Sequence, residues 1–141
     1  MRISPHVPDD EVSIFPVDFL ATILNTPARK AAERATNMYR DLFHTRMILL
    51  PIAEAAPGGY NFASVVLVNP MGWLDEAYLD RGLPCMLLLD PGDIVSVELE
   101  KTIGRRVRSF YKQVAISSPG GKKYKRKSSR FNFNLYKPEG E

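Results

Sequence analysis

The sequence predicts an α/β domain of mixed (α+β) layout, in which helices flank a mixed central sheet and a basic extension follows. Three observations predict this fold: short apolar runs of strand length, longer segments with helical spacing, and an uneven distribution of charge. The length of 141 residues fits a single domain, and 45% hydrophobic with 10% aromatic residues is ordinary for a globular protein. No apolar run approaches the roughly 20 residues of a membrane-spanning helix, so we expect no membrane span.

Three segments have the apolar spacing of helices. Residues 14–24 carry apolar side chains three and four positions apart, which predicts a short buried helix. Residues 27–43, rich in alanine and charged residues, predict a second helix that begins at a proline. Residues 95–114 predict the third, because one apolar stripe runs along them while Lys101 and Arg105 stand mostly outside that stripe.

Three apolar runs of strand length predict the central sheet. Each is apolar at successive rather than alternate positions, which suits strands that are covered on both faces. A less regular stretch, residues 71–82, separates the last two runs and predicts a loop or short helix. The three predicted strands are MILLPI (47–52), ASVVLV (63–68) and PCMLLLD (84–90).

The excess of basic residues lies near the C-terminus. The chain carries a net charge of +3, but residues 117–141 hold seven basic and two acidic side chains, a net charge of +5. The remaining 116 residues hold 12 basic and 14 acidic side chains and are slightly acidic. This imbalance predicts a separate role for the C-terminal segment. The sequence thus divides into an extended N-terminal arm (1–11), an α/β domain (12–116) and a basic aromatic extension (117–141).

Three interpretations of the extension stay open. Lysine and arginine neutralise phosphates and aromatic rings stack on bases, which predicts RNA binding. The alternation of Phe131, Phe133 and Leu135 with polar residues predicts a strand that contacts a sheet edge, either in this chain or in a partner. The third interpretation is a solvated charge run without a partner. The candidate RNA-binding residues are Lys122, Lys123, Lys125, Arg126, Lys127 and Arg130.

Cysteine and histidine are too rare to support much metal or redox chemistry. Cys85 is the single cysteine, so a disulfide within the chain is impossible and a reducing intracellular compartment is expected. Its place before an apolar run predicts a small buried side chain. His6 and His44 are the two histidines, and their positions give no zinc-ligand spacing. We expect neither a metal site nor a cofactor.

Three segments resemble the ubiquitin-like-specific cysteine proteases of the SUMO (sentrin) type. Residues 12–20, VSIFPVDFL, resemble the family's "IFSSFFY" helix. Residues 41–54, DLFHTRMILLPIAE, resemble its "DIF..D.IFIPVNE" strand, and residues 84–90, PCMLLLD, resemble its "PCILILDS" strand. The resemblance covers about residues 12–114 and implies part of a papain-like fold.

The same resemblance implies a protease site that has lost its reacting groups. In that family a cysteine attacks a peptide or isopeptide carbonyl, a histidine activates it, an aspartate orients the histidine and a glutamine helps to hold the oxyanion. The histidine position corresponds to Asn61, the following tryptophan to Phe62 and the aspartate to Asp90. The nucleophile region corresponds to SSPGGKKYKRKSS, which contains neither cysteine nor glutamine. An asparagine amide is no general base near neutral pH, so we expect no protease activity. Asp90, in Asp-Pro-Gly-Asp, also fits a simple turn.

The expected function is that of a catalytically inactive structural subunit of a large assembly. A ribonucleoprotein such as an organellar ribosome is favoured, with the extension contacting RNA and the body contacting other protein subunits. A mitochondrial location rests on that extension and on the reuse of inactive enzymes, because MRISPHVPDDEV resembles neither a secretory signal nor a typical transit peptide; nuclear and cytoplasmic locations stay open. Two alternatives are a pseudoprotease that binds a ubiquitin-like modifier without cleaving it, and a cysteine protease fragment completed by another chain.

Overall fold

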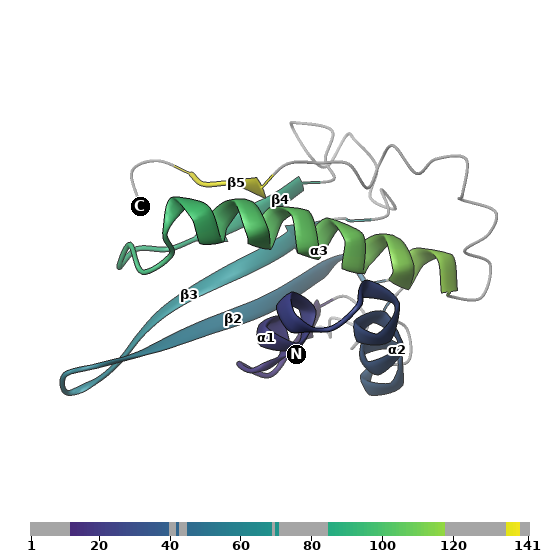
Figure 1. Ribbon diagram of the computed structural model, residues 1–141, viewed down its shortest axis with the longest axis horizontal. Coiled ribbons are helices and arrows are strands. Elements are labelled where there is room, and N and C mark those ends of the chain that lie inside the picture. The colour runs from purple at the N-terminus through teal and green to yellow at the C-terminus, as the bar shows by residue number, and fades with distance from the viewer. Residues whose placement is uncertain are drawn as a thin grey trace, which may run out of the picture.

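A computed structural model describes residues 12–39, 42, 45–68, 70, 85–117 and 135–138. Within these residues, five strands form one sheet in the order β1-β2-β3-β4-β5, accompanied by three helices (Figure 1). The mixed α+β class predicted from the sequence is confirmed. In chain order the elements are β1 (Val12–Ile14), α1 (Phe19–Asn25), α2 (Ala28–Met38), β2 (Met47–Ala56), β3 (Gly59–Val68), β4 (Cys85–Leu89), α3 (Val97–Ser117) and β5 (Leu135–Tyr136).

The sheet is antiparallel in its middle and parallel at both edges. β3 pairs antiparallel with β2 and with β4, while β1 and β5 add in parallel on either side. The turn between β2 and β3 contains Gly58, whose φ of 83° is readily adopted only without a Cβ. Pro51 stands just past the end of the β1 pairing, where β2 needs no N–H donor on that side. One row of cross-strand neighbours crosses all five strands: Ile14, Leu49, Val66, Leu87 and Tyr136.

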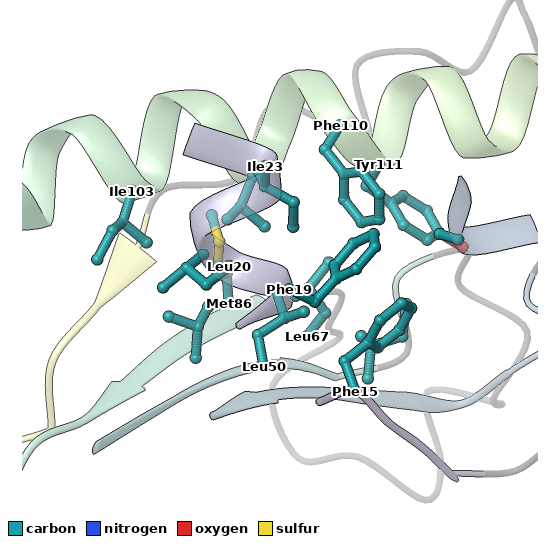
Figure 2. Close-up of a cluster of buried hydrophobic side chains, with 14 of the residues drawn as sticks. Phe15, Phe19, Leu20, Ile23, Leu50, Leu67, Met86, Ile103, Phe110 and Tyr111 are labelled. Atoms are coloured by element: carbon teal, nitrogen blue, oxygen red, sulfur yellow. The ribbon is translucent and has the colours of Figure 1, made fainter. Parts of the chain in front are cut away.

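The core lies between the helices and one face of the sheet, here called the inner face. Successive strand residues point to opposite faces, and Figure 2 shows Leu50, Leu67 and Met86 directed toward α1 and α3. The Phe19 ring lies 5.9 Å from the Phe110 ring and so joins α1 to α3. Full burial of one such side chain stabilises the fold by about 1.5–3 kcal/mol. Six strand residues of the inner face are fully buried: Ile48, Leu50, Val65, Leu67, Met86 and Leu88.

The opposite, outer face of the sheet is also apolar but only partly covered. Along its five-strand row the central Val66 is 6% exposed, whereas Ile14 and Tyr136 at the two edges are 59% and 60% exposed. An antiparallel sheet with one face in water normally alternates apolar with polar residues, and these strands do not. Among the described elements, α1 and α3 pack against the inner face (Figure 1).

Two predicted helices differ from those in the structure. Ile14 belongs to β1 rather than to the first helix, because it pairs with Leu49 of β2, and α1 begins only at Phe19. The second predicted helix, residues 27–43, ends at Met38. The next residue, Tyr39, is extended and its hydroxyl donates a hydrogen bond to the carbonyl of Ile14, so contacts with β1 replace continuation of the helix.

The predicted central strands are present, and two of them are longer than predicted. β2 continues to Ala56 and β3 begins at Gly59, so the two form a hairpin that extends past the rest of the sheet (Figure 1). The predicted loop or helix at residues 71–82 lies outside the described residues. Within the described part of the chain, no helix combines the length and the apolar character needed to cross a membrane.

Candidate functional site

Two of the three positions matched to the protease family, Asn61 and Asp90, lie at the same end of the sheet. In the β3–β4 register Ser64 faces Leu89, so Asn61 reaches the turn that follows β4. A Cβ placed on Gly92 in that turn would lie 4.0 Å from the Cβ of Asn61. Asn61 is exposed, whereas Asp90, the first residue after β4, is only 3% exposed.

Phe62 points away from Asn61, because adjacent residues of a strand face opposite sides of the sheet. Its side chain is 59% exposed and lies on the outer face. The Phe62 ring is 6.2 Å from the ring of Tyr60, with 41° between the ring planes. Both residues pair with β2 beyond the stretches of the hairpin that pair with β1 and β4, and there they form an exposed aromatic pair. This part of the hairpin extends past the rest of the sheet (Figure 1).

Asp90 organises the turn between β4 and α3. Its two carboxylate oxygens accept the backbone N–H groups of Ile94 and Val95, each at 2.9 Å, and its carbonyl accepts the N–H of Asp93 at 3.1 Å. Lys137 Nζ lies 3.9 Å from the Asp90 carboxylate and 3.3 Å from that of Asp93. Both oxygens of the buried carboxylate therefore have structural partners, which agrees with the interpretation of Asp90 as a turn residue.

The thiol of Cys85 is remote from this end of the sheet. Cys85 pairs with Val68 at the opposite end of β3 from Asn61, roughly 23 Å away at about 3.3 Å per residue. Burial raises the pKa of the thiol above its usual range, which disfavours the nucleophilic thiolate. His6 and His44 lie outside the described residues. Among the side chains that are described, no group of three His, Cys, Asp or Glu residues could hold a metal ion.

A second candidate site is a groove of about 350 Å³ between α3 and β5, here called the α3 groove. β5 approaches the helix closely at Gly104, because a Cβ on this glycine would lie 3.3 Å from the Cβ of Leu135. Of the six lining residues that the structure describes, three are cationic and one is anionic, so together they carry a net charge of +2. The lining residues are Glu100, Lys101, Gly104, Arg105, Arg108 and Leu135.

Sequence reasoning missed the α3 groove as a site. The signal in the sequence is the spacing of Lys101, Arg105 and Arg108, which places three cations on one side of a helix. That spacing also fits an ordinary solvated helix face. The packing of Leu135 against Gly104 turns the face into a groove, and this contact between segments 31 residues apart has no local sequence signal.

The predicted RNA-binding residues, 122–130, lie outside the described residues, as do Phe131 and Phe133. Leu135 is described: it is partly buried in β5 and pairs in parallel with Met86 of β4. Of the two pairings that the alternating pattern left open, Leu135 makes the one within its own chain.

No protein-family model matches the chain, and no curated protein matches its sequence. The likeness to SUMO-type proteases rests on the three sequence segments alone.

Proposed function

We propose that the chain is a catalytically inactive structural subunit of a larger assembly, a ribonucleoprotein in particular. In this proposal a partner protein covers the outer face of the sheet, and the basic extension contacts RNA. The observation that carries it is the apolar character of the outer face, which continues across all five strands. Its edges and the hairpin carry large exposed apolar side chains, and apolar surface of this kind marks a site of interaction with another macromolecule.

The composition of the outer face favours a protein partner. Cores of protein interfaces are depleted in charged residues and enriched in aromatic ones. The alternation of strand residues places no charged side chain on this face, and Tyr60 and Phe62 extend it along the hairpin. The residues that alternation assigns to the outer face are Val12, Ile14, Met47, Leu49, Pro51, Ala53, Ala55, Tyr60, Phe62, Ser64, Val66, Val68, Cys85, Leu87, Leu89 and Tyr136.

The side chains of Asn61 and Asp90 support the part of this proposal that the chain is catalytically inactive. An amide there has no useful basicity, and the carboxylate of Asp90 is occupied by backbone N–H groups. The proposal includes descent of the domain from part of a papain-like SUMO protease. The RNA contact is supported by the charge of residues 117–141, and the mitochondrial ribosome is the assembly that this extension favours.

The test is to recover the natural assembly with an affinity-tagged full chain and with a variant of its outer face. The variant Ile14→Lys with Tyr136→Lys changes two exposed side chains and should alter stability by no more than about 0.5 kcal/mol. We expect the wild-type chain to recover protein subunits together with RNA, and the variant to lose the protein subunits. The matched control is Met38→Lys with Val97→Lys, which adds the same charge at exposed helix positions. Recovery of a monomer without partners would overturn the proposal.

A second candidate function is a pseudoprotease that binds a ubiquitin-like modifier. It is favoured by the exposed Phe62 and Tyr60 beside Asn61, at the end of the sheet where the resemblance places the protease site. Its test is a pull-down with a ubiquitin-like protein, which should be insensitive to salt and lost in Phe62→Ser. Asn61→His should not create cleavage; detectable cleavage, or labelling by a thiol-reactive modifier probe, would instead support the protease completed by another chain.

A further inference from the structure

We propose that the α3 groove binds the sugar-phosphate backbone of RNA. The inference rests on the proposed ribonucleoprotein function and deepens it, because it assigns an RNA contact to the folded body of the chain. The site consists of side chains on α3, with β5 as its other wall.

The cations of the groove form a row rather than a point. Lys101, Arg105 and Arg108 follow one another at intervals of four and three residues, about 6 Å and 4.5 Å along the axis at roughly 1.5 Å per residue. A row of positive charges suits an anion whose charges repeat along a chain. Arginine adds a planar fork that binds phosphate oxygens in pairs. This arrangement favours a sugar-phosphate backbone, with its repeating phosphates, over a single small anion.

The lining also indicates which part of the RNA is bound. Base recognition in single strands uses aromatic rings for stacking. None of the six residues known to line the groove is aromatic, and Leu135 with Gly104 supplies only a small apolar floor. The contacts that these six residues can make are therefore with phosphate and sugar, which position a strand without reading its sequence.

A further cation of α3, Arg106, forms hydrogen bonds within the fold. Arg106 donates hydrogen bonds to the carbonyls of Ile23 and Thr26, at 3.2 Å and 2.9 Å, and so ties α3 to the end of α1. Lys101 and Arg105 are exposed, on the groove side of the helix. The helix thus uses one arginine to hold the fold, while two exposed cations beside it face the groove.

Chain length brings the groove within reach of the basic extension. Residue 122 follows the end of α3, Ser117, by five residues, and residue 130 precedes Leu135 by five residues. Five residues span at most about 18 Å. Because Leu135 lines the groove, a short length of chain connects the groove to the C-terminal end of this basic segment.

The test measures binding of fluorescent oligouridylate to the full chain by anisotropy as a function of salt. The groove variant is Lys101→Gln with Arg105→Gln, and the matched control is Lys30→Gln with Arg34→Gln, which removes two exposed charges from α2. We expect the groove variant to reduce the slope of log K against log salt by about 1.4, from roughly 0.7 for each phosphate contact, and the control to leave it near the wild-type value. The charge-retaining variant Lys101→Arg with Arg105→Lys should bind nearly as well as wild type, and circular dichroism should show that all variants fold.

The outcomes separate this inference from the proposed function. If the groove variant binds like its control while neutralisation of residues 122–130 abolishes binding, the inference fails and the proposed function stands. If the wild-type chain does not bind RNA at low salt, the RNA part of both fails. If polyglutamate binds with the same dependence on Lys101 and Arg105 while oligouridylate does not, the groove is a site for an acidic protein segment and the assignment to RNA is wrong.

Discussion

The buried carboxylate of Asp90 joins three parts of the chain: the end of β4, the start of α3 and the residue after β5. A carboxylate withdrawn from water is costly unless hydrogen bonds replace its hydration. The N–H groups of Ile94 and Val95 do so at 2.9 Å, and Lys137 lies close enough to offset part of the charge. The residue that the resemblance places in a protease site is therefore central to the fold.

Replacement of Asp90 by alanine is expected to lower the free energy of unfolding by about 2–4 kcal/mol, because two backbone N–H groups lose a charged acceptor. Asp90→Asn keeps one acceptor oxygen and should cost less. Urea unfolding followed by circular dichroism measures both changes. Asp93→Ala, at an exposed neighbour in the same turn, is the control. An Asp90→Ala protein as stable as wild type would contradict the anchoring role.

Tyr111 is expected to make stability depend on pH in the alkaline range. Burial raises the pKa of Tyr111 far above its usual value. A tyrosine in the unfolded chain ionises at about pH 10. The folded state thus keeps a proton that the unfolded state releases. The contribution of Tyr111 to stability is full below about pH 10 and falls as the pH rises above it.

The measurement compares urea midpoints at about pH 8 and pH 11, on either side of the tyrosine pKa. Tyr111→Phe should lose less stability between the two pH values than the wild-type protein does. Tyr60→Phe, at a side chain that is 63% exposed, should behave like wild type. An equal alkaline loss in Tyr111→Phe and wild type would show that other groups dominate.

At the scale of elements, the sequence predicts the helices and strands that contain a long hydrophobic pattern. β4 and α3 stand close to their predicted ranges, because five successive apolar residues and a long apolar stripe are strong local signals. Ile14, the last residue of β1, was predicted to begin a helix, since three residues carry too little pattern and only pairing with Met47–Leu49 makes them a strand. The same limit explains the missed α3 groove, which depends on the docking of β5.

That docking can be tested at Gly104. Alanine there gains about 1 kcal/mol of helix propensity but places a Cβ 3.3 Å from Leu135, so its net effect should be small. Gly104→Leu is expected to push β5 away and to cost about 1–3 kcal/mol through overpacking. Hydrogen exchange at Leu135 and Tyr136 should accelerate in Gly104→Leu and stay unchanged in Glu98→Leu on an exposed part of the helix. Unchanged exchange in both variants would show that β5 does not depend on this contact.

At the scale of the whole molecule, the exposed apolar side chains at the edges and hairpin of the outer face predict self-association of the isolated chain. The weight-average mass should rise with concentration, because apolar surface contacts are favourable and no charge on the outer face opposes them. Sedimentation equilibrium measures this mass. Ile14→Lys with Tyr136→Lys should keep the chain monomeric over a wider range of concentration. A wild-type chain that stays monomeric at all concentrations would show that the outer face does not drive self-association.

The contact between Lys137 and Asp93 joins residues 44 positions apart and has a consequence for the order of folding during synthesis. The β2–β3 hairpin closes through a local turn, so it can form as soon as both strands have emerged from the ribosome. β5 and Lys137 follow the other four strands in the sequence, so the sheet gains this edge after its other strands have emerged. Pulse-labelled hydrogen exchange during refolding should accordingly protect the amides of β3 before those of β5; simultaneous protection would show that the two form in one step.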